Sequence, residues 1–514
     1  MAKRSSNQPP KESNSIMRIA SGVSGLDTVL GGGLVENGLY LIEGMAGTGK
    51  TILSSQICFH QVHEGKKVLF VTLIAESHAK LLQHLGSMAY FDPEAVSKSF
   101  ILLSGYDALT AGGLQGFLEF IAGTVREHRP SFMVVDGFRT ARQARETELG
   151  LSEFIHQLNA FITGSRCTTV LLAPFSGSEP HPEHTLVDGL IELNHYASGM
   201  RRTREIEVHK LRAANHLVGK HTFEITEQGV VIFPRLEALQ ADAPVSPLDT
   251  QARLAFGIAS FDRIIDGGLV AGSVTTILGP PGAGKTLLGL KFLEDGLRNH
   301  ERCLYLGFYE PPQRLVGKAK QLGIALGPAL KSGELQIIWQ APVEQSLDEL
   351  GHRLLETVHT SQIKRVFLDG IEGFCAAAVH LERVTFFMAA LTNHLRKLGT
   401  TTLFSEETDL YGAEIRHTAF GVSAFIENVI LLRYGELRSR LYRLISIIKL
   451  RESNYDSAIH EFSISSRGLD VTASSQSAEK LLADKPQILK ARSRLSTGKG
   501  GRAITTKRAR GSPK

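Results

Sequence analysis

Several features typical of secreted, zinc-binding or membrane-spanning proteins are missing from this sequence. The four cysteines lie far apart and form no CxxC pair, which argues against a disulfide framework or a zinc site. No run approaches the roughly 18 apolar residues that cross a bilayer. The polar N-terminus lacks the apolar stretch of a signal peptide. We therefore expect a cytoplasmic protein without membrane contact.

Strong charge of either sign is also absent. A net charge of +5 is mild for 514 residues and does not by itself indicate nucleic-acid binding. The composition, 42% hydrophobic and 21% charged, is ordinary for globular domains. The length suits two or three domains, each large enough for its own core.

What the sequence does contain is a long internal duplication. Residues 22–51 read GVSGLDTVLGGGLVENGLYLIEGMAGTGKT, and residues 257–286 read GIASFDRIIDGGLVAGSVTTILGPPGAGKT. Further along the chain, VVDGF in the first half matches FLDGI in the second, and HKLR matches IKLR. Because the matches continue at nearly constant spacing, a whole domain has been repeated.

Each half alternates short apolar runs with amphipathic stretches. This pattern predicts an α/β fold, with a mostly parallel sheet flanked by helices in each half. The polar stretch PRLEALQADAPVSPLDTQ, with three prolines, indicates a linker between the halves. We predict a disordered N-terminus at 1–15, a first domain at 16–240, a linker at 241–250, a second domain at 251–472 and a basic disordered tail at 473–514.

Two glycine-rich loops carry the strongest functional signal. Both satisfy the GxxxxGK[ST] pattern, follow an apolar strand and open a helix, which is the context that a phosphate-binding P-loop requires. Glycines turn consecutive main-chain amides toward an anion, while the lysine reaches the terminal phosphates and the threonine hydroxyl ligates Mg²⁺. The residues concerned are Gly44, Gly47, Thr48, Gly49, Lys50 and Thr51, and Gly279, Gly282, Ala283, Gly284, Lys285 and Thr286.

Two pairs of acids follow apolar strands. Asp136 and Asp369 each end a strand, where a carboxylate can hold the water shell of Mg²⁺, although a turn aspartate also suits that place. Glu76 and Glu310 come just after the second strand of their halves. A carboxylate there can act as general base for the attacking group; the alternative is a surface glutamate.

Repeated cations stand on late strands. Lys210 and Arg212 recur as Lys449 and Arg451. They can stabilise charge at the γ-phosphate of a neighbouring subunit, as an arginine finger does, or form a solvated basic edge. The basic tail can contact nucleic acid or an acidic partner, but it has no aromatics to stack bases, and a solvated, solubilising tail is the preferred interpretation.

Together, the tandem loops, the G-[VI]-x-x-[LF]-D-x-[VI]-[LI]-x-G-G-L entry and the KLR strands resemble the KaiC family of circadian clock proteins over about residues 16–472. The resemblance implies two RecA-like lobes in a hexameric double ring, with ATP and Mg²⁺ between subunits. It also implies hydrolysis in the first lobe and autophosphorylation in the second, with regulatory proteins at the tail. The further nucleotide contacts that it implies are Ile52, Ser87, Lys210, Leu211, Arg212, His216 and Thr226, and Leu287, Arg443, Lys449, Leu450 and Arg451.

The chain departs from that family at three positions. The family has adjacent glutamates after the second strand of each lobe, and here the first of each pair is Ala75 or Tyr309. The phosphoacceptor pair is reduced to Ser423, because the neighbouring threonine position is Ala424. Thr418 matches a further family threonine and is a candidate relay, while Ser423 can equally be an ordinary loop serine.

These observations predict a ring-forming signalling ATPase with weakened serine/threonine autokinase activity on Ser423. Two other classes stay open. One is a DNA-dependent ATPase of the RecA type, against which the mild charge counts. The other is a nucleotide-gated scaffold that assembles with ATP but does not turn it over.

Overall fold

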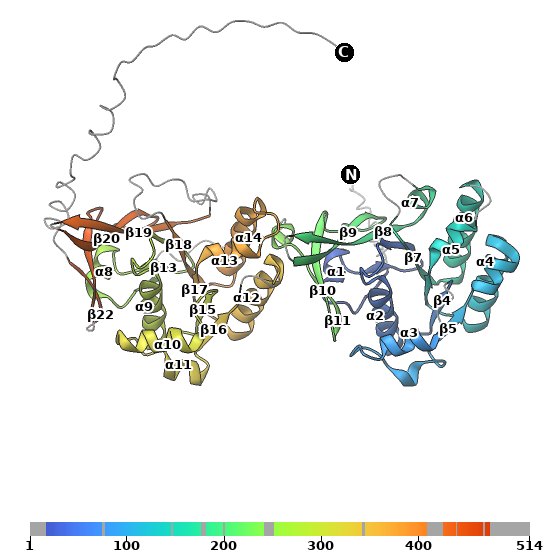
Figure 1. Cartoon of the computed structure of the whole chain (residues 1–514), viewed down its shortest axis with the longest axis horizontal. Helices are drawn as coiled ribbons and strands as arrows, with labels where there is room; N and C mark the ends of the chain where they lie inside the picture. Colours follow the sequence, from blue (N-terminus) through green and yellow to red (C-terminus); the bar gives the residue numbers. More distant parts are fainter. Residues whose placement is uncertain are drawn as a thin grey trace, which may run out of the picture.

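In the computed structural model the chain forms two lobes side by side, each built around one nine-stranded sheet (Figure 1). The structure describes residues 17–73, 78–144, 148–175, 181–198, 201–240, 251–341, 345–408, 425–437, 439–465 and 468–472. The predicted fold class, two tandem RecA-like α/β domains, is confirmed. The predicted disordered ends at 1–15 and 473–514 and the linker at 241–250 lie outside the described residues. Among the residues described, no helix has the length and apolar character needed to cross a membrane.

The first lobe has its parallel strands in the middle and on one side of the sheet. The strand order is β11-β10-β9-β8-β3-β7-β6-β4-β5, with parallel pairing from β8 to β5 and antiparallel pairing from β8 to β11. A two-stranded ribbon of β1 and β2 precedes it. The strands are β1 (Arg18–Ile19), β2 (Leu34–Val35), β3 (Leu39–Gly44), β4 (Val68–Thr72), β5 (Phe100–Ser104), β6 (Phe132–Asp136), β7 (Thr168–Ala173), β8 (Gly189–Ser198), β9 (Arg201–Leu211), β10 (Lys220–Thr226) and β11 (Gly229–Phe233).

The second lobe repeats this plan. Its order is β16-β15-β17-β18-β14-β19-β20-β21-β22, again parallel up to β19 and antiparallel beyond it. The strands are β12 (Arg253–Leu254), β13 (Leu269–Val270), β14 (Val274–Gly279), β15 (Cys303–Gly307), β16 (Leu335–Trp339), β17 (Arg365–Asp369), β18 (Thr401–Glu407), β19 (Asn428–Leu437), β20 (Arg440–Leu450), β21 (His460–Ser465) and β22 (Gly468–Thr472).

Helices cover both faces of each sheet, so the central strands β3 and β14 are buried along their whole length. In the first lobe one core joins α1 and α2 to the sheet, and a second core joins α4, α5 and α6 to its other face. The helical elements are α1 (Leu26–Val29), α2 (Lys50–His63), α3 (His78–Leu85), η1 (Pro93–Ala95), α4 (Tyr106–His128), α5 (Phe138–Gln143), α6 (Glu148–Ser165), α7 (Pro182–Leu186) and η2 (Leu236–Gln240).

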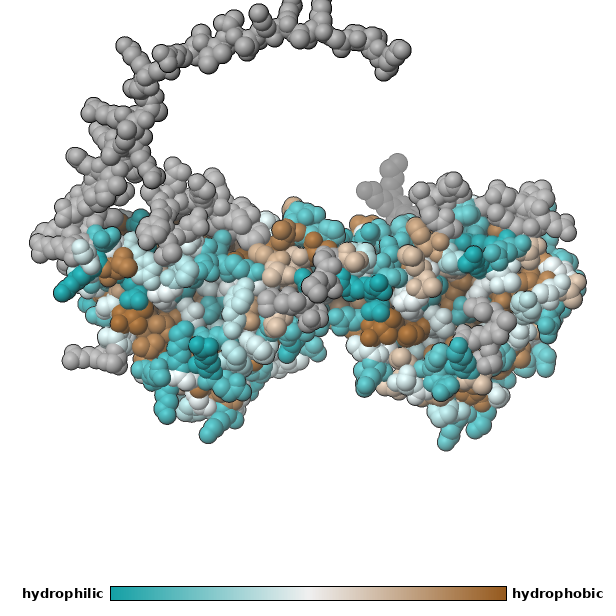
Figure 2. Space-filling model, in the orientation of Figure 1, coloured by the Kyte–Doolittle hydropathy of each residue, from teal (hydrophilic) through white to brown (hydrophobic). Residues whose placement is uncertain are grey.

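The helices of the second lobe divide in the same way. One core contains residues of α8 to α11, and the other contains residues of α12 to α14. Their bounds are α8 (Ala259–Ile264), α9 (Lys285–Arg298), α10 (Pro312–Gln321), α11 (Gly327–Ser332), α12 (Leu347–Ser361), α13 (Ile371–Ala377) and α14 (Arg383–Lys397). On the face drawn in Figure 2, hydrophilic residues predominate and hydrophobic ones gather in small groups on both lobes.

The polar stretch between the lobes is not a spacer over its whole length. Its first residues form η2, and Leu236 is fully buried in the second-lobe core beside α12 and α14. Residues 236–240 therefore belong to the folded part of the chain, outside the predicted linker at 241–250, because two leucines among the polar residues supply apolar surface to bury. The lobes are joined further by Arg201, which donates to Gln345 O at 3.3 Å and to Ala376 O at 2.6 Å.

Candidate functional site

Each glycine-rich loop lies between the end of a buried central strand and the start of a helix. Residues 44–50 connect β3 to α2, and residues 279–285 connect β14 to α9. Gly49 and Gly284 are the N-caps of the two helices, with φ of 102° and 110°. Residues that have a Cβ rarely adopt this backbone conformation. The free amides of each first helical turn therefore point toward the loop, where an anion is favoured.

The two lysines have the same geometry. Lys50 Nζ donates to Gly44 O at 2.6 Å and to Met45 O at 2.9 Å. Lys285 Nζ donates to Gly279 O at 2.6 Å and to Pro280 O at 3.1 Å. Burial lowers the pKa of both lysines, and nearby carboxylates oppose this effect. Each ammonium is thus held over its own loop, at the place where phosphate oxygens would lie.

A hydroxyl and a carboxylate meet beside each loop. Thr51 Oγ1 donates to Asp136 Oδ2 at 2.8 Å, and Thr286 Oγ1 donates to Asp369 Oδ1 at 3.2 Å. Asp136 and Asp369 end β6 and β17, so their carboxylates lie at the same sheet edge as the loops. Hydroxyl and carboxylate oxygens are the donors that Mg²⁺ prefers, so the residues present fit this ion.

The first loop borders a pocket of about 390 Å³ that includes a residue not predicted from the sequence. The pocket is lined by Gly47, Gly49, Lys50, Thr51, Ile52, Arg204 and Ile225. Arg204 pairs with His195 on β8, just as Arg443 pairs with Tyr434 on β19. Arg204 Nε is buried and has no hydrogen-bond partner among the described residues.

Arg443, which the family resemblance singled out, contacts the second loop directly. Its Nε donates to Gly282 O at 3.2 Å, and Tyr434 Oη donates to Pro281 O at 3.2 Å. Arg204 occupies the same register position in the first lobe. The sequence carries a signal for this equivalence, because Arg204 and Arg443 each stand six residues before the lysine of the repeated KLR sequence, and the strand pairing agrees.

Of the two predicted general bases, only Glu310 lies among the described residues. Glu76 lies outside the described residues, as does Ala75. Glu310 is half-buried just past β15, and its Oε2 accepts a hydrogen bond from Lys318 Nζ at 3.3 Å. The preceding Tyr309 is 66% exposed. The predicted phosphoacceptors Ser423 and Thr418, with Ala424, also lie outside the described residues.

The structure does not bring the repeated KLR cations to the P-loop of their own lobe. Arg212 N donates to Asp188 O, and Asp188 Oδ2 accepts from Leu39 N, where β3 begins. The loop follows the opposite end of β3, roughly 16 Å away at about 3.3 Å per residue. Lys210 and Arg212 bond the Thr185 carbonyl beside that starting edge.

The second lobe repeats this arrangement. Arg451 N donates to Asn428 Oδ1, and Lys449 Nζ donates to Ile426 O at 2.6 Å. Asn428 begins β19 and pairs with Thr275 near the start of β14, again at the edge away from the loop. Burial lowers the pKa of Lys210 and Lys449, and the adjacent Arg212 and Arg451 lower it further. Both cation pairs therefore face away from the loop of their own chain.

The other nucleotide contacts implied by the resemblance are spread around the lobes. Thr226 follows Ile225, which lines the first pocket, and its Oγ1 donates to Gly229 O at 3.3 Å. Ser87 is exposed and donates to His84 O at 2.8 Å. His216 lies beside the end of α1, near Gly31. Three of the predicted positions contribute buried side chains to the cores, namely Leu211, Leu287 and Leu450.

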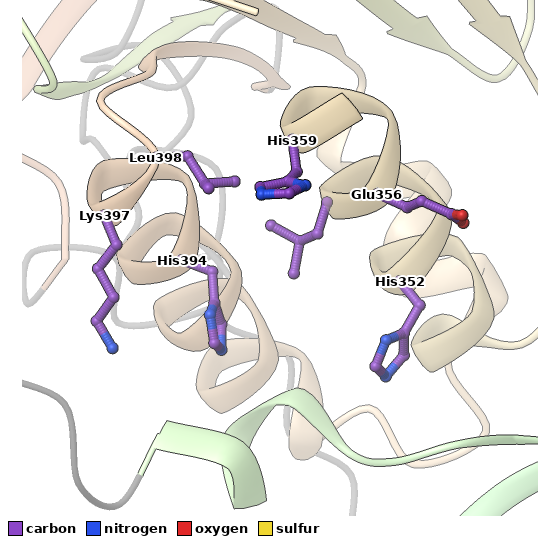
Figure 3. Close-up of a pocket in the computed structure, with 7 residues that line it drawn as sticks. His352, Glu356, His359, His394, Lys397 and Leu398 are labelled. Carbon is purple, nitrogen blue, oxygen red and sulfur yellow. The ribbon is translucent and has the colours of Figure 1, made fainter. Parts of the chain in front are cut away.

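A second pocket, of about 470 Å³, lies at the junction of the lobes (Figure 3). His352 and His359 project into it from α12, and His394 projects from α14. His352 Nε2 donates to Pro234 O at 2.7 Å, which links α12 to the first lobe. Burial, with Lys397 and His352 nearby, lowers the pKa of His394. The pocket includes Lys397 and Leu398, just before β18 starts, so it lies at the sheet edge opposite the loop.

Two lobes with one P-loop each, and a hydroxyl–carboxylate pair beside each loop, define a tandem RecA-like P-loop protein. A family model described as "ATPase: KaiC" matches residues 19–237 and again residues 254–476. The chain belongs to the KaiC ATPase family, and this membership implies nucleotide binding.

Named relatives match over nearly the whole chain. The "Circadian clock oscillator protein KaiC" of Picosynechococcus sp. is 26% identical over 498 residues, covering 93% of this chain and 95% of the relative. "Circadian clock oscillator protein KaiC 1" of Synechocystis sp. is 25% identical over 494 residues, covering 93% and 94%. The KaiC of Synechococcus elongatus is 25% identical over 489 residues, covering 92% and 93%.

Proposed function

We propose that this KaiC-family ATPase binds ATP with Mg²⁺ at both P-loops and hydrolyses it in a ring of identical subunits. The observation that carries the proposal is the repeated geometry of the two loops. In each lobe a lysine ammonium lies on the loop carbonyls, and a threonine hydroxyl meets a strand-end aspartate. The same arrangement at equivalent places in both lobes supports function at both sites.

The chain's own residues divide the work of phosphate binding. Main-chain amides of the loops cradle the phosphates, while Lys50 and Lys285 leave their loop carbonyls to contact the terminal oxygens. Thr51 with Asp136, and Thr286 with Asp369, would hold Mg²⁺, which neutralises phosphate charge when bound. Arg204 and Arg443 add a guanidinium at the loop mouth.

The position of the KLR cations supports sites shared between subunits. Lys210, Arg212, Lys449 and Arg451 lie at the sheet edge away from their own loops. A neighbouring subunit in a ring can bring these cations to a γ-phosphate, where positive charge stabilises the transition state. The mild overall charge and the absence of aromatics in the tail favour this role over DNA-dependent hydrolysis.

Autophosphorylation is the finer part of the proposal. Glu76 in the first lobe and Glu310 in the second are the glutamates that the sequence predicts to orient the nucleophile. Ser423 is the proposed acceptor, with Thr418 as a relay, and Ala424 in place of a second acceptor restricts the modification to one site. The relatives are named as clock oscillators; for this chain we propose ATP-driven signalling, with regulatory proteins at the basic tail.

Calorimetry of the full chain with Mg²⁺ and an ATP analogue tests the proposal. We expect two binding events per chain, and one in Lys50→Ala or Lys285→Ala. Because a hydrogen bond to a charged group contributes about 1.5–3 kcal/mol, affinity at the altered site should fall by about 10-fold or more. No uptake at either loop would contradict nucleotide binding.

Labelled ATP followed by mass spectrometry separates the finer possibilities. Label on Ser423 that disappears in Lys285→Ala establishes the autokinase. Phosphate release without protein labelling leaves an ATPase. Assembly with ATP but no release leaves a scaffold, and strong stimulation by single-stranded DNA supports the recombinase-type alternative.

A further inference from the structure

The second site has a tyrosine where a carboxylate was expected. Tyr309 lies two residues past the end of β15 and is 66% exposed. Its partial burial and the nearby Glu372 carboxylate raise the pKa of its hydroxyl. A phenol that stays protonated does not take a proton from water near neutral pH. The next residue, Glu310, has its carboxylate engaged by Lys318. Other carboxylates near the second loop are therefore candidates to prepare the nucleophile at this site.

Two carboxylates that the sequence analysis did not single out lie at the mouth of the second loop. Glu407 ends β18 and pairs directly with Gly279, the first residue of the loop. Thr408 N donates to Gly279 O at 3.1 Å, and Lys285 Nζ donates to the same oxygen at 2.6 Å. The end of β18 is therefore attached to the carbonyl that holds the P-loop lysine.

Glu372 reaches the same place from the first turn of α13, three residues after Asp369. Its Oε1 accepts a hydrogen bond from Glu407 N at 2.5 Å, which fixes the carboxylate at the end of β18. A Cβ placed on Gly370 would lie 3.5 Å from Glu372 Oε2 and 3.6 Å from the ring of Tyr309. The carboxylate of Glu372 thus occupies the space beside the residue that replaces the expected glutamate.

Electrostatics agree with this placement. Burial lowers the pKa of Lys285. Three nearby carboxylates raise it, with the largest effect from Glu407, then Glu372, then Asp369. These carboxylates therefore lie close to the group that would contact the terminal phosphates. In the first lobe, strand pairing places Arg139 and Pro174 where Glu372 and Glu407 stand. The first lobe also lacks the expected glutamate, at Ala75, but these two additional carboxylates stand only in the second lobe.

We propose that Glu372 orients and deprotonates the attacking water at the second P-loop, and that the main chain of Glu407 positions it. This inference rests on the proposed function. The water oxygen attacks the γ-phosphorus while its proton passes to the Glu372 carboxylate. The bond from that phosphorus to the β–γ bridging oxygen breaks, and its electron pair leaves with ADP. The proton then returns to solvent, so the products are ADP, inorganic phosphate and one proton.

The test uses the full chain with Lys50→Ala, so that turnover reports the second site. Glu372→Gln should lower the hydrolysis rate by about 100-fold or more, the usual contribution of a general base. Binding of a non-hydrolysable ATP analogue, measured by calorimetry, should be unchanged or tighter, because a negative charge beside the γ-phosphate has been removed. Formate should partly restore the rate of Glu372→Ala.

Two further variants sharpen the comparison. Glu310→Gln represents the rival carboxylate, and Glu382→Gln is the matched control because Glu382 is exposed and its carboxylate pairs with His380. We expect the largest loss in Glu372→Gln and none in Glu382→Gln. A loss in Glu310→Gln with a normal rate in Glu372→Gln overturns the inference, as does loss of analogue binding without formate rescue.

Failure of the proposed function gives a different result. A Lys50→Ala parent that binds the analogue but releases no phosphate contradicts hydrolysis at the second site, and with it the role of Glu372. A parent that does not bind the analogue contradicts the nucleotide site itself. In both cases the parent, and not only the Glu372 variants, is affected.

Discussion

At the scale of single residues, the carboxyls around the second loop are unusual in number and in environment. Asp369 accepts hydrogen bonds from Thr286, Ser405 and Tyr305. Glu406 follows Ser405 on β18 and is 6% exposed. Its Oε2 has no hydrogen-bond partner among the described residues. Burial, with Glu372 nearby, raises the pKa of Glu406 from 4.5 to about 7. This carboxyl should destabilise the folded chain when it ionises.

We expect the Glu406→Gln variant to be more stable than the parent at about pH 8. Because the folded pKa is raised, the folded chain holds a proton that the unfolded chain has lost between pH 4.5 and about 7, so stability falls as pH rises through this window. The gain in the free energy of unfolding should be at most about 3 kcal/mol and should vanish near pH 4.5. Denaturant unfolding at both pH values measures it.

The exposed Glu382→Gln serves as control for this experiment and should show no such pH-dependent gain. An equal gain for Glu406→Gln at both pH values would point to packing and not to ionisation of the carboxyl.

At the scale of elements, each P-loop is fitted closely against a late strand of the same sheet. A Cβ on Gly49 would lie 2.6 Å from Ile225 Cδ1 on β10, and one on Gly284 would lie 2.8 Å from Phe462 Cε1 on β21. The loop therefore depends on glycine for its backbone conformation and for its packing. The same fit in both lobes shows that the antiparallel extension of each sheet supports the phosphate site.

For Gly284→Ala we predict loss of nucleotide uptake at the second loop and a lower free energy of unfolding. The positive φ alone costs of order 1–3 kcal/mol, and the contact with Phe462 adds to this cost. Gly333→Ala is the matched control, since Gly333 also has positive φ, at 81°, but open space around its Cβ. Calorimetry and thermal unfolding should show that Gly333→Ala keeps nucleotide binding. Unaltered binding in Gly284→Ala would contradict the fitted loop.

At the scale of the whole molecule, a charge network lies where the two lobes meet. Arg383 on α14 donates to Asp348 Oδ1 at 2.9 Å and to Glu237 Oε1 at 2.9 Å, near η2. Asp348 is fully buried; burial raises its pKa, and Arg383 opposes this rise. Thr222 of the first lobe also contacts Asp348, with 3.4 Å between Oγ1 and Oδ2. The junction is thus a paired charge network beside the buried Leu236.

Removing Arg383 should weaken this junction strongly. We expect Arg383→Met to lose about 3–5 kcal/mol of stability, because Asp348 would be buried without its partner. The double variant with Asp348→Leu should lose less than the sum of the two single variants. Denaturant unfolding at a fixed protein concentration measures the three variants, and additive losses would argue against direct coupling between Arg383 and Asp348.

A mixing experiment tests whether the KLR cations act between subunits. Arg451→Ala and Lys285→Ala should each lose turnover at the second site when assayed alone. When the two proteins are mixed, some interfaces combine an intact loop with an intact cation, so activity should reappear. Rates that stay at the sum of the separate preparations would show that Arg451 does not act in trans.

The order of residues along the chain was enough to predict the duplication, the α/β class and both P-loops. These features depend on local spacing: a strand, a glycine turn and a helix follow one another directly. The repeat spacing aligns Arg204 with Arg443, but it could not show that Glu372 meets Glu407 beside Lys285, or that Leu236 belongs to the second core. Those contacts join segments brought together by sheet pairing and lobe packing, and so only the tertiary structure decided them.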